Sequence, residues 1–236
     1  MQALAINIGA NTTLPGFRGP IDANASFVYV PIPERKPTRF EVPTYADLTL
    51  PISIPEEHLD TPVHLDPSFA TYPCCTTYTY GDEHAVKSSQ ISKLATGDRL
   101  YFYATLTTAA EQPPAWMPPR WGAYLIGHFT LDCDPVLGAH EHDLSATLRE
   151  KYRENAHCKR QTLDARVLVS GDPNHSHLYD HAIPLSASNA GREAGTLITD
   201  YSRDSGAGPW WRRPIWFSDP DYVLERVSAD NDAINT

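Results

Sequence analysis

The sequence lacks the motifs that identify the common nucleotide-binding and hydrolytic folds. It has no GxxxxGK[ST] or GxGxxG spacing for a phosphate-binding loop, no GxSxG nucleophile elbow and no helical HExxH zinc motif. It has four cysteines but no CxxC pair, which argues against a zinc ribbon or a thioredoxin-like redox site. Any chemistry must therefore come from less familiar combinations of residues.

Long apolar runs and excess positive charge are also missing. No apolar run approaches the roughly 20 residues that a membrane-spanning helix requires, and the N-terminus lacks the basic and apolar regions of a signal peptide. We therefore expect a cytoplasmic protein with reduced cysteines and no membrane partner. A formal net charge of −10 argues against a general nucleic-acid coat, because such binding relies on neutralising phosphates, although it is compatible with a local basic cleft.

The clearest structural signal lies in residues 88–132. A short helical segment closed by Gly97 precedes a strand in which apolar and polar residues alternate, which predicts one apolar and one mixed face. A second strand, 121–131, is apolar on both faces, as is typical of a strand in the middle of a sheet. These elements predict the packing core of the protein.

The rest of the chain predicts short strands and many loops, since 21 prolines stand against 13 glycines. The best helical pattern covers 143–156, where apolar residues recur every fourth position and Asp143 is a candidate N-cap. No shift in composition marks a linker. We therefore expect one α+β, mainly β, domain over residues 1–228 with a mixed or barrel-like sheet, followed by a disordered tail at 229–236.

Three histidine-rich places could supply metal ligands: residues 64–66, residues 140–142, and residues 175–177 with His181 nearby. On a strand, side chains at i and i+2 face the same way, so His64 and Asp66 are the best pair. The alternative is a turn in which the Asp66 carboxylate accepts local N–H groups. Ten histidines in 236 residues form such pairs by chance, so the sequence alone assigns no metal ligand and no cofactor.

Tryptophan and arginine lie side by side at Arg120–Trp121, at 210–213 and near Trp216. An exposed tryptophan beside an arginine offers base stacking, cation–π contact and phosphate pairing. The alternative, to which we give equal weight, is that the tryptophans belong to the core and the arginines to the surface. The solvent exposure of the tryptophans distinguishes the two interpretations. We take Arg120, Trp121 and Arg212 as candidate ligand-binding residues.

Several segments, in order along most of the chain, resemble the nucleotide modification associated domain 3 (Nmad3) family. They are NIGANTTLPGFRGPI, FVYVPIPE, TYADL, HLDPSF, GDRLYFYATL, GAYLIGHFTL, ENAH and LVSGD, and the combination of PIPE with HLDP is the most specific. The resemblance implies association with systems that modify or process nucleotides and DNA bases in prokaryotes and their viruses.

The resemblance also implies that polar residues of these motifs line one pocket: Arg18, Glu34, His64, Asp66, Asn155 and His157. Within that set we assign catalytic roles to His64, Asp66 and His157 and ligand-binding roles to the others. For His157 the alternative is a dipole partner at a helix C-terminus.

Residues 88–132 are also similar, more weakly, to PUA-like domains of the EVE and ASCH kind. Those domains are β-barrels that bind nucleic acids and often take a base into a pocket, which implies ligand-binding roles at the rim for Arg99 and Tyr101.

The sequence thus predicts a protein that binds or processes a nucleotide or a modified base, in nucleic acid or free, alongside protein partners of a modification system. One alternative is an enzyme with His64 or His157 as general base, and with Asp66 or Glu34 as its partner or as a metal ligand. The other is a structural component of a modification complex.

Overall fold

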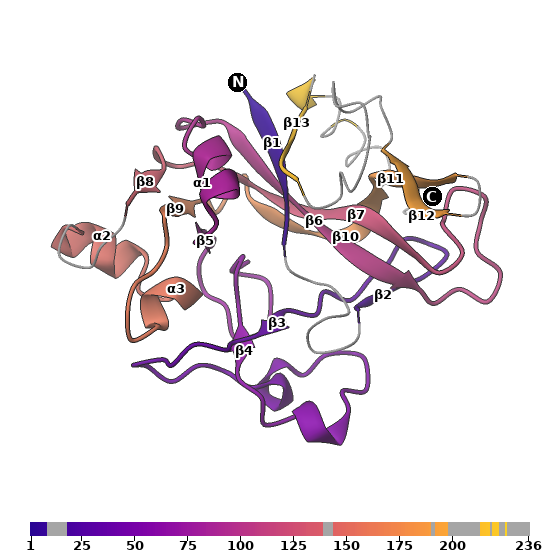
Figure 1. Ribbon diagram of the computed structural model, residues 1–236, viewed down its shortest axis with the longest axis horizontal. Coiled ribbons are helices and arrows are strands. Elements are labelled where there is room, and N and C mark those ends of the chain that lie inside the picture. Colours follow the sequence, from indigo (N-terminus) through magenta and orange to yellow (C-terminus); the bar gives the residue numbers. More distant parts are fainter. Residues whose placement is uncertain are drawn as a thin grey trace.

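The computed structural model describes residues 1–8, 18–138, 144–189, 192–197, 213–217, 219–221 and 225. Its largest element is a mixed sheet with strand order β10-β7-β6-β1-β13, in which β2 also pairs with β6 (Figure 1). The strands are β1 (Ala3–Asn7), β2 (Pro20–Ile21), β6 (Arg99–Thr108), β7 (Trp121–Thr130), β10 (His177–Pro184) and β13 (Ile215–Trp216). β1 and β2 run parallel to β6, and the other pairs are antiparallel.

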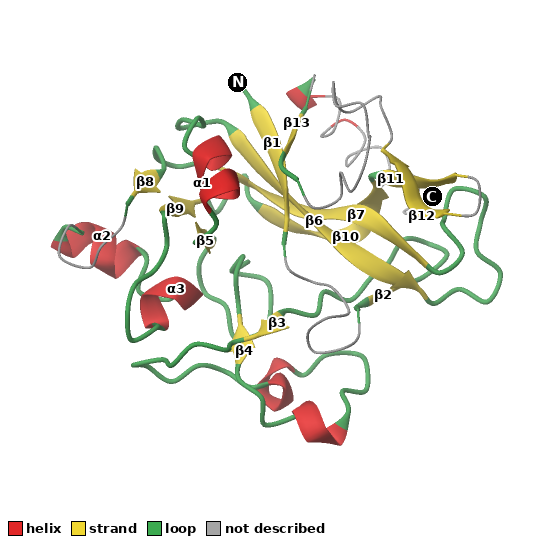
Figure 2. Cartoon of the chain, in the orientation of Figure 1, coloured by secondary structure: helices red, strands yellow, loops and turns green. Residues whose placement is uncertain are grey.

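Smaller sheets and short helices surround the main sheet (Figure 2). The strands are β3 (Ile32–Pro33) with β4 (Val63–His64), β5 (Thr79–Asp82) with β9 (Val167–Ser170) and β8 (Val136–Leu137), and β11 (Ser186–Asn189) with β12 (Arg192–Leu197). The helices are the 3-10 turns η1 (Tyr45–Leu48) and η2 (Glu56–His58), then α1 (Ala85–Ile91), α2 (Ala146–Lys151) and α3 (Ala156–Lys159). The fold is therefore mainly β, as the sequence predicts.

The central strands β6 and β7 of the main sheet are buried on both faces, because a hydrophobic core packs against each face. Leu100 and Phe102 point into the larger core, and Tyr101 and Tyr103 point into a second core on the other face. The sequence predicted a mixed second face for β6, but both tyrosine rings are fully buried there. Their hydroxyls reach the backbone of a C-terminal segment that covers this face, which is why polar-tipped side chains fit inside.

Two predictions of architecture need correction. The sheet is mixed but not closed into a barrel, so the expected PUA-like barrel is not confirmed. In place of one helix over 143–156, the structure has α2 and α3 with a turn between them. α2 ends at Lys151 with Tyr152 as its C-cap, and Asn155, whose backbone is extended (ψ 137°), caps the start of α3 with its side chain. The N-cap of α2 is Ser145, and Asp143 lies outside the described residues.

The expected tail at 229–236 also lies outside the described residues. Among the residues described, no helix has the length and apolar character needed to cross a membrane.

Candidate functional site

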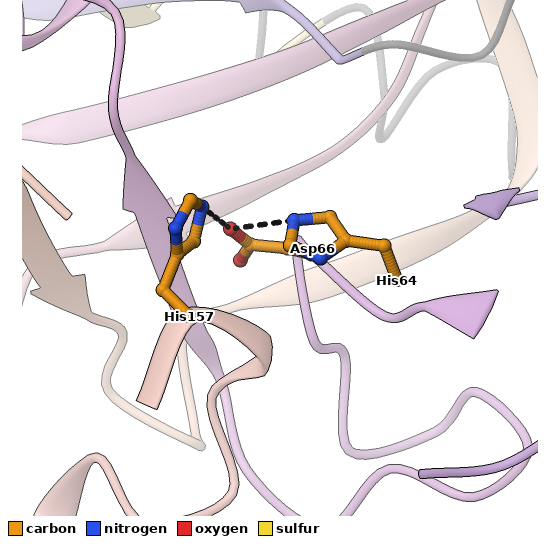
Figure 3. Close-up of side chains that lie close together, drawn as sticks. All are labelled: His64, Asp66 and His157. Atoms are coloured by element: carbon orange, nitrogen blue, oxygen red, sulfur yellow. Dashed lines mark ion pairs between the residues drawn. The ribbon is translucent and has the colours of Figure 1, made fainter. Parts of the chain in front are cut away.

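Three ionisable side chains meet where β4, β5 and α3 come together. His64 ends β4 and Asp66 follows two residues later on the same side, while His157 comes from the first turn of α3. The Asp66 carboxylate lies between the two rings, with Oδ2 3.8 Å from Nε2 of His64 and 3.3 Å from Nε2 of His157 (Figure 3). All three residues are buried. Strand alternation does not account for the first pair, because β4 ends at His64 and the Asp66 N–H donates to the His64 carbonyl at 3.0 Å in a tight turn.

Each histidine is held from behind by a carboxylate. Nδ1 of His64 lies 2.6 Å from Glu34 Oε2, and Nδ1 of His157 lies 2.7 Å from Asp164 Oδ1. Because a carboxylate accepts, each Nδ1 carries a hydrogen and donates it, which turns the Nε2 atoms toward Asp66. Arg160 also comes within 3.3 and 3.1 Å of the two Nδ1 atoms, but both groups are donors there, so these are packing contacts.

A buried arginine joins the two supporting carboxylates. Arg160 Nε donates to both Glu34 oxygens at 3.1 and 3.2 Å, while Nη1 donates to both Asp164 oxygens at 2.9 and 3.0 Å. The same Nη1 reaches Glu83 at 3.1 Å, and Lys36 pairs with Glu83 and Asp164 from the solvent side. The fixed fork of the guanidinium sets the spacing of both carboxylates and hence of both histidines.

Asp66 itself is fixed by remote partners. The backbone N–H of Gly81 on β5 donates to both of its carboxylate oxygens, at 3.0 and 3.1 Å, and Asn155 Nδ2 donates to Oδ1 at 3.2 Å. These donors lie 15 and 89 residues away in the sequence, so Asp66 is not the local turn carboxylate that the alternative interpretation supposed. The arrangement orients its Oδ2 toward the histidines.

Asn155 explains why His157 lies at this position. Its side-chain oxygen accepts from the His157 backbone N–H at 3.0 Å, while its amide nitrogen bonds Asp66. One fully buried asparagine therefore starts α3 and links it to the centre. His157 lies in the single turn of α3 and bonds Asp66 and Asp164, so it is more than the dipole partner that the alternative interpretation supposed.

Electrostatic interactions favour the charged forms of both His157 and Asp164. Burial lowers the pKa of His157, but its bonds to Asp164 and Asp66 outweigh that effect and raise the pKa to about 9. Burial likewise raises the pKa of Asp164, but His157 and Lys36 hold it below its ordinary value. In this arrangement His157 is an imidazolium at neutral pH, bridging two carboxylates.

Because of Glu34, we expect the stability of the protein to fall at low pH. Burial raises its pKa, but bonds from His64, Lys36 N–H and Arg160 prevail and lower the pKa from 4.5 to about 2. A depressed carboxylate pKa stabilises the fold above the unfolded value and loses that contribution as the pH falls toward the folded value. We therefore expect the free energy of unfolding to drop by about 3 kcal/mol more in the wild type than in Glu34→Gln between pH 6 and 2.

Urea unfolding of both proteins across this range measures the difference. Parallel stability curves for the two proteins would contradict the depressed pKa.

The centre opens into a cavity of about 130 Å³. Besides the three central residues, its lining includes Gly81, Glu83 and Arg160 from the supporting network, and Ile8, Ile32, Tyr80, Asp82, His84 and Lys87 on the remaining sides. Lys87 lies 2.8 Å from Asp82, and the Tyr80 hydroxyl donates to the same carboxylate. A cavity of this size admits water, a phosphate or one edge of a base rather than a whole nucleotide.

The structure brings together five of the residues that the sequence singled out: Glu34, His64, Asp66, Asn155 and His157. Arg18 and Trp121 lie elsewhere, where the guanidinium stacks on the indole at 4.7 Å. Because Arg18 covers one face of the Trp121 ring, that face is not open for stacking on a base.

The remaining candidates also lie away from the cavity. Tyr101 is fully buried in the second core, and Arg99 pairs with Asp221 at 3.0 Å. Arg120 is exposed beside the start of β7, and Arg212 lies outside the described residues. The cavity lining described above includes none of them, so the rim expected from residues 88–132 does not join this site.

Among the described residues, the histidine-rich place at 175–177 does not form a comparable group. His175 is exposed and pairs with Asp172, and residues 140–142 lie outside the described residues. In the part of the chain that the structure describes, ligand-type side chains converge in just two groups: His64, Asp66 and His157, and Glu83, His157 and Asp164.

Sequence reasoning missed the residues that support the centre. Arg160 follows the ENAH motif by three positions, and Glu83 follows β5, but neither carries a motif of its own. Asp164 gives no local signal at all. Their roles arise from pairings between segments far apart in the sequence, such as Arg160 with Glu34 across 126 residues.

Comparison with known proteins gives one result. The model of the family described as nucleotide modification associated domain 3 (Nmad3) matches residues 2–232. The chain belongs to this family. Nmad3 membership links the domain to nucleotide modification, and its match spans both the main sheet and the site. No curated protein and no solved structure matches the chain.

Proposed function

We propose that this Nmad3 domain is an enzyme that acts on a nucleotide or on a base in nucleic acid, with His64, Asp66 and His157 as its reaction centre. The observation that carries the proposal is the convergence of these three buried side chains beside a cavity. A protein that only reads a base needs an open aromatic pocket with basic walls instead. Buried histidines backed by carboxylates are the arrangement that catalysis by proton transfer or by a bound ion requires.

The size of the cavity supports a mode of binding in which only the reacting part of the substrate enters it. The reacting phosphate or base edge enters the space beside Asp66, where Lys87, paired with Asp82, also lines the cavity. The bulk of the substrate stays outside it. This arrangement fits a flipped base or the end of a nucleotide.

A second cavity favours nucleic-acid binding as a second candidate function. It has a volume of about 460 Å³ beside α2 and α3, and its lining includes Arg39, Arg149, Arg153 and Phe40. The Phe40 side chain is 52% exposed and lies against Arg39. Arginines beside an exposed ring suit stacking on a base with contacts to phosphate.

Turnover assays separate the two candidates. The full chain is incubated with nucleotides and with plain and base-modified DNA and RNA oligomers, with and without divalent ions, and products are identified by mass spectrometry. We expect product formation that falls at least about 100-fold in Asp66→Asn and His157→Gln, because these groups act at the reacting atoms. His175→Gln, an exposed histidine away from the cavity, is the matched control and should keep the full rate.

Equal rates in the wild type and in Asp66→Asn would contradict the enzyme proposal. Saturable binding without turnover in any condition, weakened by Phe40→Ala, would support the binding candidate instead. Neither binding nor turnover would leave a structural role in a modification complex.

A further inference from the structure

The three central side chains present one nitrogen or oxygen each to a single point. One ring nitrogen of His64, one ring nitrogen of His157 and a carboxylate oxygen of Asp66 all lie within 4.8 Å of one another. Two donor atoms bound to one zinc-sized ion at about 2.1 Å lie roughly 3.4 Å apart at a tetrahedral angle. The observed separations from Asp66 Oδ2 are 3.3 and 3.8 Å, which lie within a few tenths of an ångström of that value.

The atoms behind the two rings are arranged as in metal sites. A metal-bound histidine usually donates its other ring N–H to a carboxylate, which fixes the tautomer and makes the ligating nitrogen more basic. Here Glu34 and Asp164 provide that support at 2.6 and 2.7 Å. Both carboxylates are in turn fixed by Arg160.

The charge of the cluster also calls for a cation. An ion bound to Nε2 of His157 displaces the proton of the imidazolium, and without that proton four carboxylates (Glu34, Asp66, Glu83 and Asp164) surround two permanent cations, Arg160 and Lys36. Two negative charges then remain, since the nearby Asp82 and Lys87 neutralise each other. A divalent ion supplies the missing charge, and buried carboxylates without compensation are costly.

The donor set selects the kind of ion. Two imidazoles with one carboxylate suit first-row transition ions such as Zn²⁺, Fe²⁺ or Co²⁺, whereas Mg²⁺ and Ca²⁺ prefer oxygen ligands throughout. Three protein ligands leave coordination positions open, which distinguishes catalytic from structural ions. Those positions face the 130 Å³ cavity.

The second convergent group is a poorer site. Glu83 and Asp164 are already neutralised by Arg160 and Lys36, and Nδ1 of His157 donates to Asp164. An ion there would have to displace the arginine. We infer that His64, Asp66 and His157 bind one divalent first-row transition ion whose open positions face the cavity, where it activates water or a substrate oxygen.

This inference deepens the proposed function but is tested without any nucleotide. The full chain is first treated with a chelator and exchanged into metal-free buffer, then titrated with CoCl₂ and followed by visible absorption and equilibrium dialysis, with ZnCl₂ as competitor. We expect one Co²⁺ per chain, with the intense visible bands of four- or five-coordinate cobalt, displaced by Zn²⁺.

Variants decide which atoms hold the ion. Asp66→Asn, which preserves shape but removes the charged ligand, should weaken the Kd for Co²⁺ at least about 100-fold. Asp164→Asn keeps all three ligands and should weaken it by about 10- to 100-fold. His175→Gln should leave it unchanged. Circular dichroism checks each fold, and Asp164→Asn decides alone should Asp66→Asn fail to fold.

Equal Kd values for the wild type, Asp66→Asn and Asp164→Asn would overturn the inference, as would no Co²⁺ bound at about 1 mM. A chain that binds Co²⁺ as expected but turns over no nucleotide contradicts the proposed function alone.

Discussion

Arg160→Met is expected to lower the free energy of unfolding by about 3–5 kcal/mol at neutral pH, because it leaves buried carboxylates without their partner. Arg160 is 7% exposed and donates to Glu34, Asp164 and Glu83. Methionine fills much of the same volume, so the loss reports charge rather than packing. Urea unfolding monitored by circular dichroism measures it.

Two further variants test the cause of that loss. Arg153→Met removes an exposed arginine paired with Glu150 and Glu154, and should cost less than about 1 kcal/mol. Arg160→Lys keeps the charge but loses the fork, and should fall between wild type and Arg160→Met. A loss below 1 kcal/mol in Arg160→Met would mean that the carboxylates do not depend on this cation.

Gly81→Ala is expected to reduce turnover about 100-fold while the chain stays folded. A Cβ at this position would lie 2.8 Å from Cδ2 of His157 and 3.2 Å from Oδ1 of Asn155. His157 must therefore move from Asp66, and misplacement of a catalytic group by about 1 Å can cost that factor. The product assay measures the rate, and Co²⁺ titration should show weaker binding in the same variant.

Gly122→Ala is the matched control for this substitution. It also adds a methyl group within a strand, where the Cβ would meet the Tyr124 side chain at 2.8 Å in the core. It should cost stability but leave the rate per folded molecule unchanged. Equal losses of rate in both variants would show that Gly81 acts through general stability rather than through His157.

The parts of the fold that follow from local pattern could be predicted from the sequence. Alternation along β6 predicted that strand, and the continuous apolar run of β7 predicted both the second strand and its place in the middle of the sheet. Gly97, with a φ of +86°, marks the turn before β6 because such a backbone favours glycine. Whether both faces of β6 are buried depends on what the C-terminal segment covers, which no local pattern reveals.

The candidate site was predictable only as far as motifs and short spacing reach. His64 and Asp66 lie close together because they are two residues apart across a tight turn, and the family resemblance linked them with Glu34, Asn155 and His157. Arg160 and Asp164 were not predicted, because their roles depend on tertiary contacts that no local pattern shows. The helical pattern over 143–156 failed because α2 already ends at Lys151, and Asn155, which bonds Asp66 across the fold, starts a separate helix.

The most direct test of the central claim is a crystal of the full chain grown with Co²⁺, with anomalous diffraction recorded on both sides of the cobalt absorption edge. The expected result is one strong peak within about 2.0–2.2 Å of Nε2 of His64, Nε2 of His157 and a carboxylate oxygen of Asp66. A fully ordered centre without a peak, or a peak confined to exposed histidines such as His175, would contradict the account.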